Sequence, residues 1–153
     1  MRHTLLSCSL ALVLTACSST SSEVSGSLLF GESNATTALR GDKPAVLHFW
    51  TDDCAMCMSD VDVLLSTQEE FPEFALISVY VGDDASAARA SWRSIGEPFP
   101  LLVDKQNTLW QGYQVTTLPT TLFLNAEGLV ISRVDAPLDA ALAPMRMLEI
   151  QQM

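Results

Sequence analysis

An apolar run, Ala45–Trp50, ends in a polar turn that leads directly to two cysteines, Cys54 and Cys57. Apolar residues then recur at helical spacing as far as Gln68, so this stretch predicts a buried strand, a turn and the start of a helix. The first amide groups of a helix are unpaired and carry partial positive charge, which stabilises a thiolate, the reactive form of cysteine. Because the second thiol can attack the sulfur of the first, such a pair can cycle between a dithiol and a disulfide.

The rest of the chain predicts a βαβα unit followed by ββα, an order that indicates a mixed sheet with helices on both faces. The expected strands are 27–30, 75–81, 101–103, 120–124 and 129–134, and the expected helical segments are 35–39, 85–95, 107–113 and 138–151. In the helix 85–95 we expect Trp92 and Ile95 on one face and Gly96 as the stop.

The last helix, 138–151, is predicted to be amphipathic. The residues expected to face the core are Leu142, Met145, Leu148 and either Ile150 or Met153. Pro144 lies inside this segment and predicts a kink or a late start, because proline cannot donate the backbone hydrogen bond of a helix interior.

The N-terminal residues 1–17 are predicted to be a signal peptide and not part of the fold. The apolar stretch 5–14 is too short to span a bilayer. The small residues before Cys17 resemble the lipobox of bacterial lipoproteins, in which the matching cysteine is lipidated and becomes the mature N-terminus. An ordinary signal peptide with a chance cysteine is the alternative. Ser18 after the cysteine resembles the outer-membrane sorting pattern, so we expect a lipid-anchored protein of the cell envelope that faces the periplasm, on the outer membrane.

Composition and cysteine count narrow the class of protein. Residues 18–27 are expected to be a Ser-rich tether, and residues 28–153 one domain. Cys8 would be removed with the signal and Cys17 would carry the lipid, which leaves Cys54 and Cys57 only each other. Because the loop between them is tiny, a disulfide there contributes little as a staple, and a redox role explains the pair better. The net charge of -10 disfavours nucleic acid as a partner.

Four segments carry a resemblance to a known family. They are Phe49-Trp50-Thr51 before Cys54-Ala55-Met56-Cys57, Phe99-Pro100-Leu101 before Asp104, Leu118-Pro119-Thr120-Thr121, and Phe123 to Val130 with the turn Asn125-Ala126-Glu127-Gly128. From about 37 to 149 the chain resembles the thioredoxin superfamily and, within it, the TlpA/ResA-type exported thiol-disulfide oxidoreductases. The resemblance implies an α/β, thioredoxin-like three-layer fold. The chain departs from the family pattern at Asp53, Met56 and Asp62, where the family has a second tryptophan, a proline between the cysteines and a proline in the helix.

The position of each cysteine and the resemblance together suggest roles at the site. Cys54, first at the helix start, is the expected nucleophile, and Cys57 the resolving thiol. Asp60 stands where the family has an acid that accepts a proton or tunes a thiol, and a solvated acid is the alternative reading. An inert structural disulfide is the alternative for the pair itself.

A second set of residues is expected to bind the partner. Pro119, cis in the family, is expected to face the cysteines and, with Leu118, to offer backbone to an extended peptide. A trans turn proline is the alternative. Trp50 is assigned to the same substrate-binding set as the floor of the site, with plain core packing as its alternative.

Charge and ligand count complete the expected chemistry. Asp52 and Asp53 oppose the Cys54 thiolate by about as much as the helix start favours it, which predicts reduction or isomerisation of partner disulfides rather than strong oxidation. The expected partners are protein disulfides and an upstream thiol donor. No cofactor beyond the Cys54–Cys57 disulfide is expected, and no metal, because His48 in a strand interior reads as a core histidine.

Two other functions stay open. A thiol peroxidase is the enzymatic rival, because Thr51 and Cys54 match half of a peroxiredoxin-like pattern, although Leu47 stands where that pattern has a proline. The non-enzymatic rival is a binding or assembly module that keeps the fold and does not use the thiols.

Overall fold

The computed structural model describes residues 27–28 and 43–153. The predicted signal peptide, Cys17, the tether up to residue 26 and the helical turn at 35–39 lie outside these residues. In the part of the chain that is described, no helix is both long enough and apolar enough to cross a membrane.

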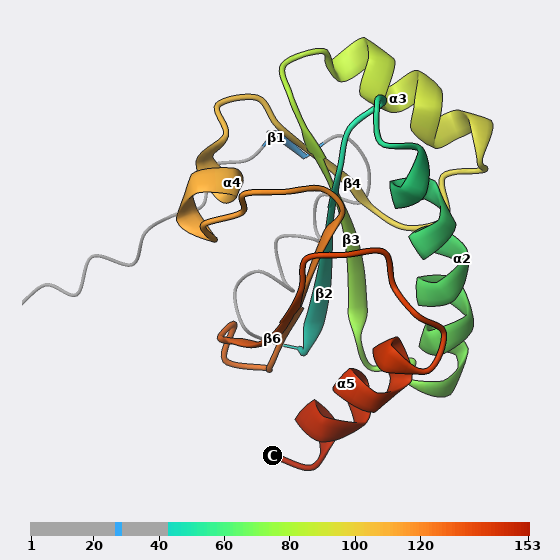
Figure 1. The fold of residues 1–153 in the computed structure, drawn as a ribbon, viewed down its shortest axis with the longest axis vertical. Helices are drawn as coiled ribbons and strands as arrows, with labels where there is room; N and C mark the ends of the chain where they lie inside the picture. Colours follow the sequence, from blue (N-terminus) through green and yellow to red (C-terminus); the bar gives the residue numbers. More distant parts are fainter. Residues whose placement is uncertain (1–26, 29–42) are drawn as a thin grey trace, which may run out of the picture.

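Six strands form one mixed sheet in the order β1-β4-β3-β2-β5-β6 (Figure 1). Strands β2, β3 and β4 are mutually parallel, whereas β1, β5 and β6 each run antiparallel to the neighbour they join. Their bounds are β1 Ser27–Leu28, β2 Ala45–Trp50, β3 Ala75–Val81, β4 Leu101–Asp104, β5 Thr120–Leu124 and β6 Val130–Val134. The sheet is therefore mixed, as the order of elements in the sequence predicts.

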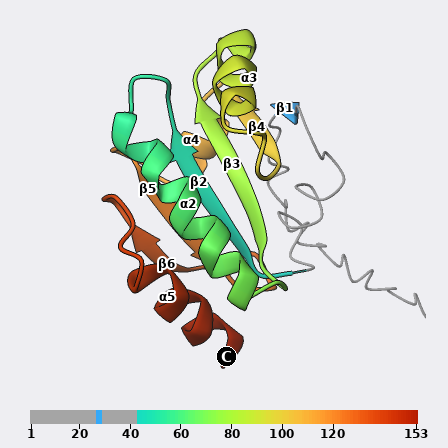
Figure 2. The ribbon, with the colours of Figure 1, turned by 90° about the vertical axis from the view of Figure 1, so that its right-hand side faces the viewer.

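Helices cover both faces of the sheet unequally. Helices α2, α3 and α5 lie over one face, and α4 lies over the other (Figure 2). Their bounds are α2 Ala55–Glu70, α3 Ala85–Ser94, α4 Thr108–Gly112 and α5 Leu142–Gln151. This is the three-layer α/β arrangement expected from the resemblance.

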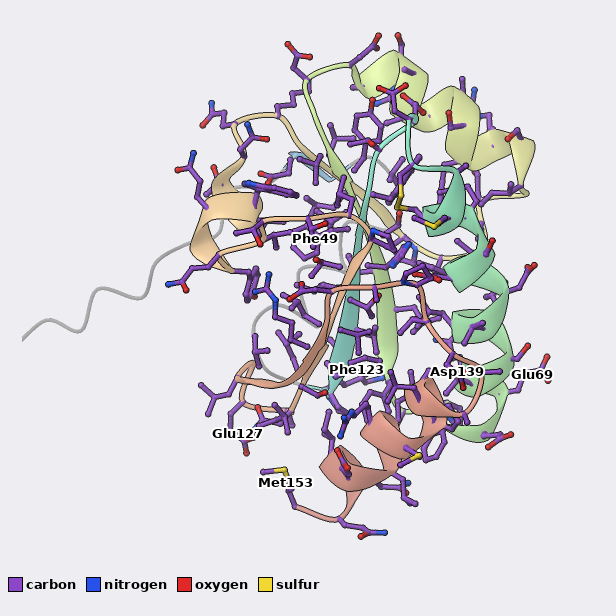
Figure 3. All side chains as sticks on the ribbon, in the orientation of Figure 1. Phe49, Glu69, Phe123, Glu127, Asp139 and Met153 are labelled. Carbon is purple, nitrogen blue, oxygen red and sulfur yellow. A yellow bond between two sulfur atoms is a disulfide. The ribbon has the colours of Figure 1, made fainter. Side chains whose placement is uncertain are left out.

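The central strand β2 is buried along its whole length because both of its faces are covered. Its side chains alternate between two apolar clusters. Val46 and Trp50 join the cluster beneath α2, α3 and α5, whereas Phe49 joins the cluster beneath α4. Figure 3 labels Phe49 together with Phe123, which belongs to the cluster on the opposite face. His48 shares the α2 side with Val46 and Trp50, and this places an imidazole behind the cysteine pair.

The last helix differs from the prediction in its start and its phase. It begins at Leu142 because Pro144 is then its third residue, where a backbone N–H has no partner within the helix. The predicted inward face was wrong for Met145, Leu148 and Met153, which are 55%, 44% and 80% exposed. The buried stripe is Ala143, Met147 and Ile150, and only Ile150 belongs to the predicted set. Both stripes are apolar and helically spaced, so spacing alone does not choose between them.

The buried face of helix α3 differs from the prediction at one residue. Trp92 is fully buried as predicted, but Ile95 lies one residue past the helix end and is 41% exposed. Ala88 completes the buried face instead. Gly96 adopts a φ of 88°, which suits glycine, and terminates the helix as predicted.

Candidate active site

The two cysteines form a disulfide at the N-terminus of α2, with their Cα atoms 5.4 Å apart. Cys54 is the N-cap residue of the helix and is partly exposed, whereas Cys57 is fully buried. The amide of Cys54 donates to the carbonyl of Thr51, closing the turn between β2 and α2. One sulfur can therefore meet a partner molecule, and the other can be reached only from within the protein.

The turn that carries Cys54 is fixed by side chains from two other elements. The hydroxyl of Tyr80 on β3 donates to Oδ2 of Asp52 over 2.7 Å, and the hydroxyl of Ser91 on α3 donates to Oδ1. Burial, together with the hydrogen bond to Asp52, raises the pKa of Tyr80, so its hydroxyl stays protonated and keeps donating. Sequence reasoning identified Asp52 only as a charge near Cys54, because both of its partners are distant in the chain.

Trp50 lies beneath the site and not on its surface. Its side chain is 1% exposed, stacks on Trp92 at a centroid distance of 5.5 Å and donates from Nε1 to the hydroxyl of Ser78. Trp50 was expected to form the floor of the site, with plain core packing as the alternative, and its side chain belongs to the core cluster beneath α2, α3 and α5.

The Leu118–Pro119 bond is cis, as the resemblance implied. In the pairing of β2 with β5, Phe49 lies opposite Thr120, so Pro119 sits at the same end of the sheet as the cysteine turn. Pro119 is buried and Leu118 is half-buried. A groove of about 440 Å³ brings Leu118 of this loop together with Cys54 and is lined by Thr51, Asp53, Cys54, Ala55, Met56 and Leu118.

A second network, which sequence reasoning missed, holds the segment that precedes the cis proline. Arg133 on β6 donates to the backbone carbonyls of Tyr113 and Gln114 and to the carboxylate of Asp135. Arg133 also holds the pKa of Asp135 below its usual range. Oδ1 of Asp135 in turn accepts from the hydroxyl of Thr120, the first residue of β5. An arginine in an edge strand carries no sequence signal of this role.

Asp60 is fully buried, so its alternative as a solvated acid was wrong. Oδ1 accepts the backbone N–H of Leu138 at 2.8 Å, and Oδ2 is buried without a hydrogen-bond partner. Burial raises the pKa of Asp60 to about 6, although the Leu138 hydrogen bond opposes this shift. The carboxyl group can therefore gain or lose a proton near neutral pH.

His48 is a satisfied core histidine, as expected. Its Nε2 lies 3.0 Å from the carbonyl of Cys57, and its Nδ1 lies 3.1 Å from the hydroxyl of Thr121. Burial lowers its pKa to about 4, so the ring is neutral at pH 7. In the described residues, no group of three or more His, Cys, Asp or Glu side chains could hold a metal ion.

Known proteins resemble this chain in sequence. The sequence pattern of the AhpC/TSA family matches residues 24–133. The thiol-disulfide oxidoreductase ResA of Bacillus subtilis is 29% identical over 94 residues, which make up 60% of this chain and 52% of ResA. The chain spans about half the length of the curated relatives it matches first.

Solved structures share the fold. A secreted Mycobacterium tuberculosis disulfide oxidoreductase, described as homologous to Escherichia coli DsbE, has a TM-score of 0.63 and 25% identity, covering 74% of this chain and 86% of its own. An exposed lipoprotein thioredoxin of Streptococcus pneumoniae has a TM-score of 0.67 and 17% identity, covering 82% of this chain and 99% of its own. These likenesses establish the thioredoxin-like fold.

Proposed function

The chain belongs to the AhpC/TSA family and has a thioredoxin-like fold, and from this premise we propose that it is an exported thiol-disulfide oxidoreductase that reduces or isomerises disulfides of partner proteins. The observation that carries the proposal is the asymmetry of the pair. Cys54 is accessible at a helix N-terminus beside the cis-proline loop, and Cys57 is buried behind it. A disulfide that served only as a staple would not need one sulfur at the rim of a groove.

The reaction starts from the reduced pair. The Cys54 thiolate attacks a partner disulfide, forming a mixed disulfide and releasing one partner thiolate. Cys57 then loses its proton to the Asp60 carboxylate, and its thiolate attacks the sulfur of Cys54. The Cys54–Cys57 bond forms, and the second partner sulfur leaves as a thiolate that takes a proton from solvent. The partner gains two electrons and the pair loses two, so an upstream thiol donor must reduce the pair again.

The groove fits an extended segment of a partner protein. Met56 is 57% exposed beside Cys54 and, with Leu118, offers apolar contact to residues that flank the partner's cystine. We expect the backbone at Leu118, the residue of the loop that lines the groove, to pair with the partner's main chain, as in other forms of strand addition. Specificity would then come from the side chains next to the cystine.

The proposed site of action is the cell envelope. The signal-like N-terminus supports export, and the M. tuberculosis relative is described as secreted and the S. pneumoniae neighbour as an exposed lipoprotein. We assign the lipid anchor to Cys17 and the destination to the periplasmic face of the outer membrane. Labelled fatty acid should enter the wild-type protein and not C17A, and the label should appear in the outer-membrane fraction. Equal labelling of both proteins would contradict the assignment.

The central test is a trap in the full-length protein. A Cys57→Ser variant should accumulate mixed disulfides between Cys54 and exported proteins, whereas the matched C54S variant should capture none. Absence of captured partners in C57S, together with failure of the reduced protein to cleave the disulfides of insulin, would reject the proposal. Stoichiometric peroxide consumption by the reduced protein would favour the peroxidase instead. A C54S strain with an unchanged phenotype would favour a binding module.

A further inference from the structure

A buried pair of ionisable side chains lies directly behind the resolving cysteine. His48 on β2 and Asp60 on α2 are both 0% exposed, and 3.9 Å separates His48 Nδ1 from Asp60 Oδ2. Oδ2 has no hydrogen-bond partner. Because almost all buried polar atoms are paired in native proteins, this oxygen needs an explanation.

The contacts of His48 fix which ring nitrogen carries the proton. The Cys57 carbonyl can only accept, so Nε2 is the donor. In a neutral ring Nδ1 is then the acceptor, and the Thr121 hydroxyl donates to it. Nδ1, the ring nitrogen that carries the lone pair, also lies 3.9 Å from Asp60 Oδ2.

We propose that His48 is a positioning residue that presents the Nδ1 lone pair to Asp60, so that the buried carboxyl group can hold the proton released by Cys57. This inference rests on the proposed function and adds to it a residue that acts through Asp60 and does not touch the reacting sulfurs. Without an acceptor, a protonated Asp60 would bury an unpaired O–H group, which costs free energy.

The proton balance places this step between the two halves of disulfide exchange. When Cys57 attacks the mixed disulfide, its proton moves to Oδ2 of the Asp60 carboxylate, and the new O–H donates to Nδ1 of His48. Neither His48 nor Asp60 is oxidised or reduced in this step. Asp60 returns the proton to Cys57 when an upstream thiol reduces the Cys54–Cys57 bond and Cys57 leaves as a thiolate.

The hydrogen bond requires only a small local movement. The separation of 3.9 Å must shorten by about 1 Å to reach hydrogen-bond length. The Thr121 hydroxyl competes for the same lone pair and can turn away by rotating about its C–O bond. Thr121 should therefore weaken proton binding at Asp60, and its removal should strengthen it.

Groups facing the pair come from each element packed against it. Cys54 and Cys57 stand at the start of α2, and the carbonyl of Cys57 accepts from His48. Strand β5 contributes the neutral hydroxyl of Thr121, and the segment before α5 contributes the Leu138 amide. In the reduced protein the ionisable set is therefore His48, Asp60 and the two thiols. In the oxidised protein the two cysteines form a disulfide and do not titrate, so the titration of His48 and Asp60 can be measured without them.

Two substitutions separate the two contacts of His48. In H48Q the amide nitrogen replaces Nε2 and can still donate to the Cys57 carbonyl, but no acceptor faces Asp60. In H48N the side-chain oxygen replaces Nδ1 and can still face Asp60, but the contact with Cys57 is lost. A role limited to packing predicts similar effects of both variants.

The measurement is a carbon-13 NMR titration of the Asp60 carboxyl group in the oxidised full-length chain, with D60N to assign the signal. H48Q should lower the titration midpoint by about one pH unit, a tenfold loss of proton affinity, and H48N should change it by less than half as much. T121V, a near-isosteric variant, should raise the midpoint. Equal shifts in H48Q and H48N, or no shift in H48Q, would overturn the inference.

The kinetic counterpart separates this inference from the proposed function. The pH profile for resolution of a mixed disulfide should move in H48Q by the same amount as the NMR midpoint. If exchange proceeds with an unchanged profile in H48Q, the role of His48 fails and the oxidoreductase stands. If the NMR shift appears but the wild-type chain exchanges no disulfide, the proposed function fails and the transfer role fails with it.

Discussion

The hydroxyl of Tyr80 donates a hydrogen bond of 2.7 Å to Oδ2 of Asp52 and so joins the end of β3 to the turn before Cys54. Ser91 on α3 holds the other carboxylate oxygen. Cys54 thus follows a turn that is held by side chains of β3 and α3, and its position depends on residues far from it in the chain.

A Tyr80→Phe substitution should loosen this turn. It removes one hydrogen bond to a carboxylate while leaving the ring in place, and the expected cost is about 1.5–3 kcal/mol in the free energy of unfolding. Urea unfolding of Y80F, D52N and the double variant measures the coupling between the two side chains. A Y80F cost of the same size in the D52N background would show that the hydrogen bond is not its source.

Replacing Asp53 should make Cys54 more reactive. Asp53 lines the groove beside Cys54, and its carboxylate opposes the thiolate by about 1 kcal/mol at an effective dielectric between those of protein and water. D53N should therefore increase the rate of Cys54 alkylation at pH 7 by about threefold to tenfold and make the reduction potential less negative. The control is D62N, which neutralises an exposed acid on α2. Equal acceleration in both variants would point to net charge instead of proximity.

The buried pair should make opposite contributions to stability between pH 4 and pH 6. Burial raises the pKa of Asp60 from 3.8 to about 6, so its contribution to stability falls as the pH rises through this range. Burial lowers the pKa of His48 from 6.5 to about 4, so its contribution rises over nearly the same range. The two terms nearly cancel in the wild type.

Single substitutions should uncover each term. Relative to the wild type, D60N should gain stability as the pH rises from about 4 to 6, and H48N should lose stability as the pH rises from about 4 to 6.5. Each change should amount to about 3 kcal/mol, from about two pKa units at 1.36 kcal/mol each. Urea unfolding at half-unit pH intervals measures both, and parallel pH profiles of the two variants would contradict this assignment.

Arg133 should matter for proteins more than for small disulfides. An Arg133→Met substitution removes the donors that hold the carbonyls of Tyr113 and Gln114, and the loop before Pro119 should lose its fixed position. We expect KM for a protein disulfide to rise several-fold while Cys54 reacts with a small aromatic disulfide at an unchanged rate. R146M, which breaks an ion pair within α5, should change neither. A slower reaction with the small disulfide in R133M would place the effect at Cys54 itself.

The central strands and the redox motif could be predicted from the sequence because their signals are local. The bounds of β2 and β3, Ala45–Trp50 and Ala75–Val81, agree with the apolar runs, since strands covered on both faces are rich in apolar side chains. The cysteine pair follows from its spacing and from the strand before it. The cis peptide bond between Leu118 and Pro119 was predicted from the family resemblance and not from the residues alone.

The remaining features depend on contacts between distant segments. Asp60 is buried because the loop before α5 passes over it and supplies the Leu138 amide, and no pattern within α2 signals this. The same holds for Ser91, whose hydroxyl meets Asp52 across 39 positions of the chain. The phase of α5 was mistaken because its sequence offers two apolar stripes and the packing against α2 and β5 selects one.

The alternation of β2 sets a strict length requirement on the connections at its two ends. His48 and Trp50 point toward the cysteine helix only in the present frame, and Phe49 points away from it. A single-residue insertion that slid this strand by one position would exchange the two sets, placing a benzene ring where the imidazole now meets Cys57. Variation in length is therefore expected to accumulate at distal hairpins such as Asn125–Gly128 and to be absent beside β2. A random-insertion library selected for disulfide exchange would make that asymmetry visible.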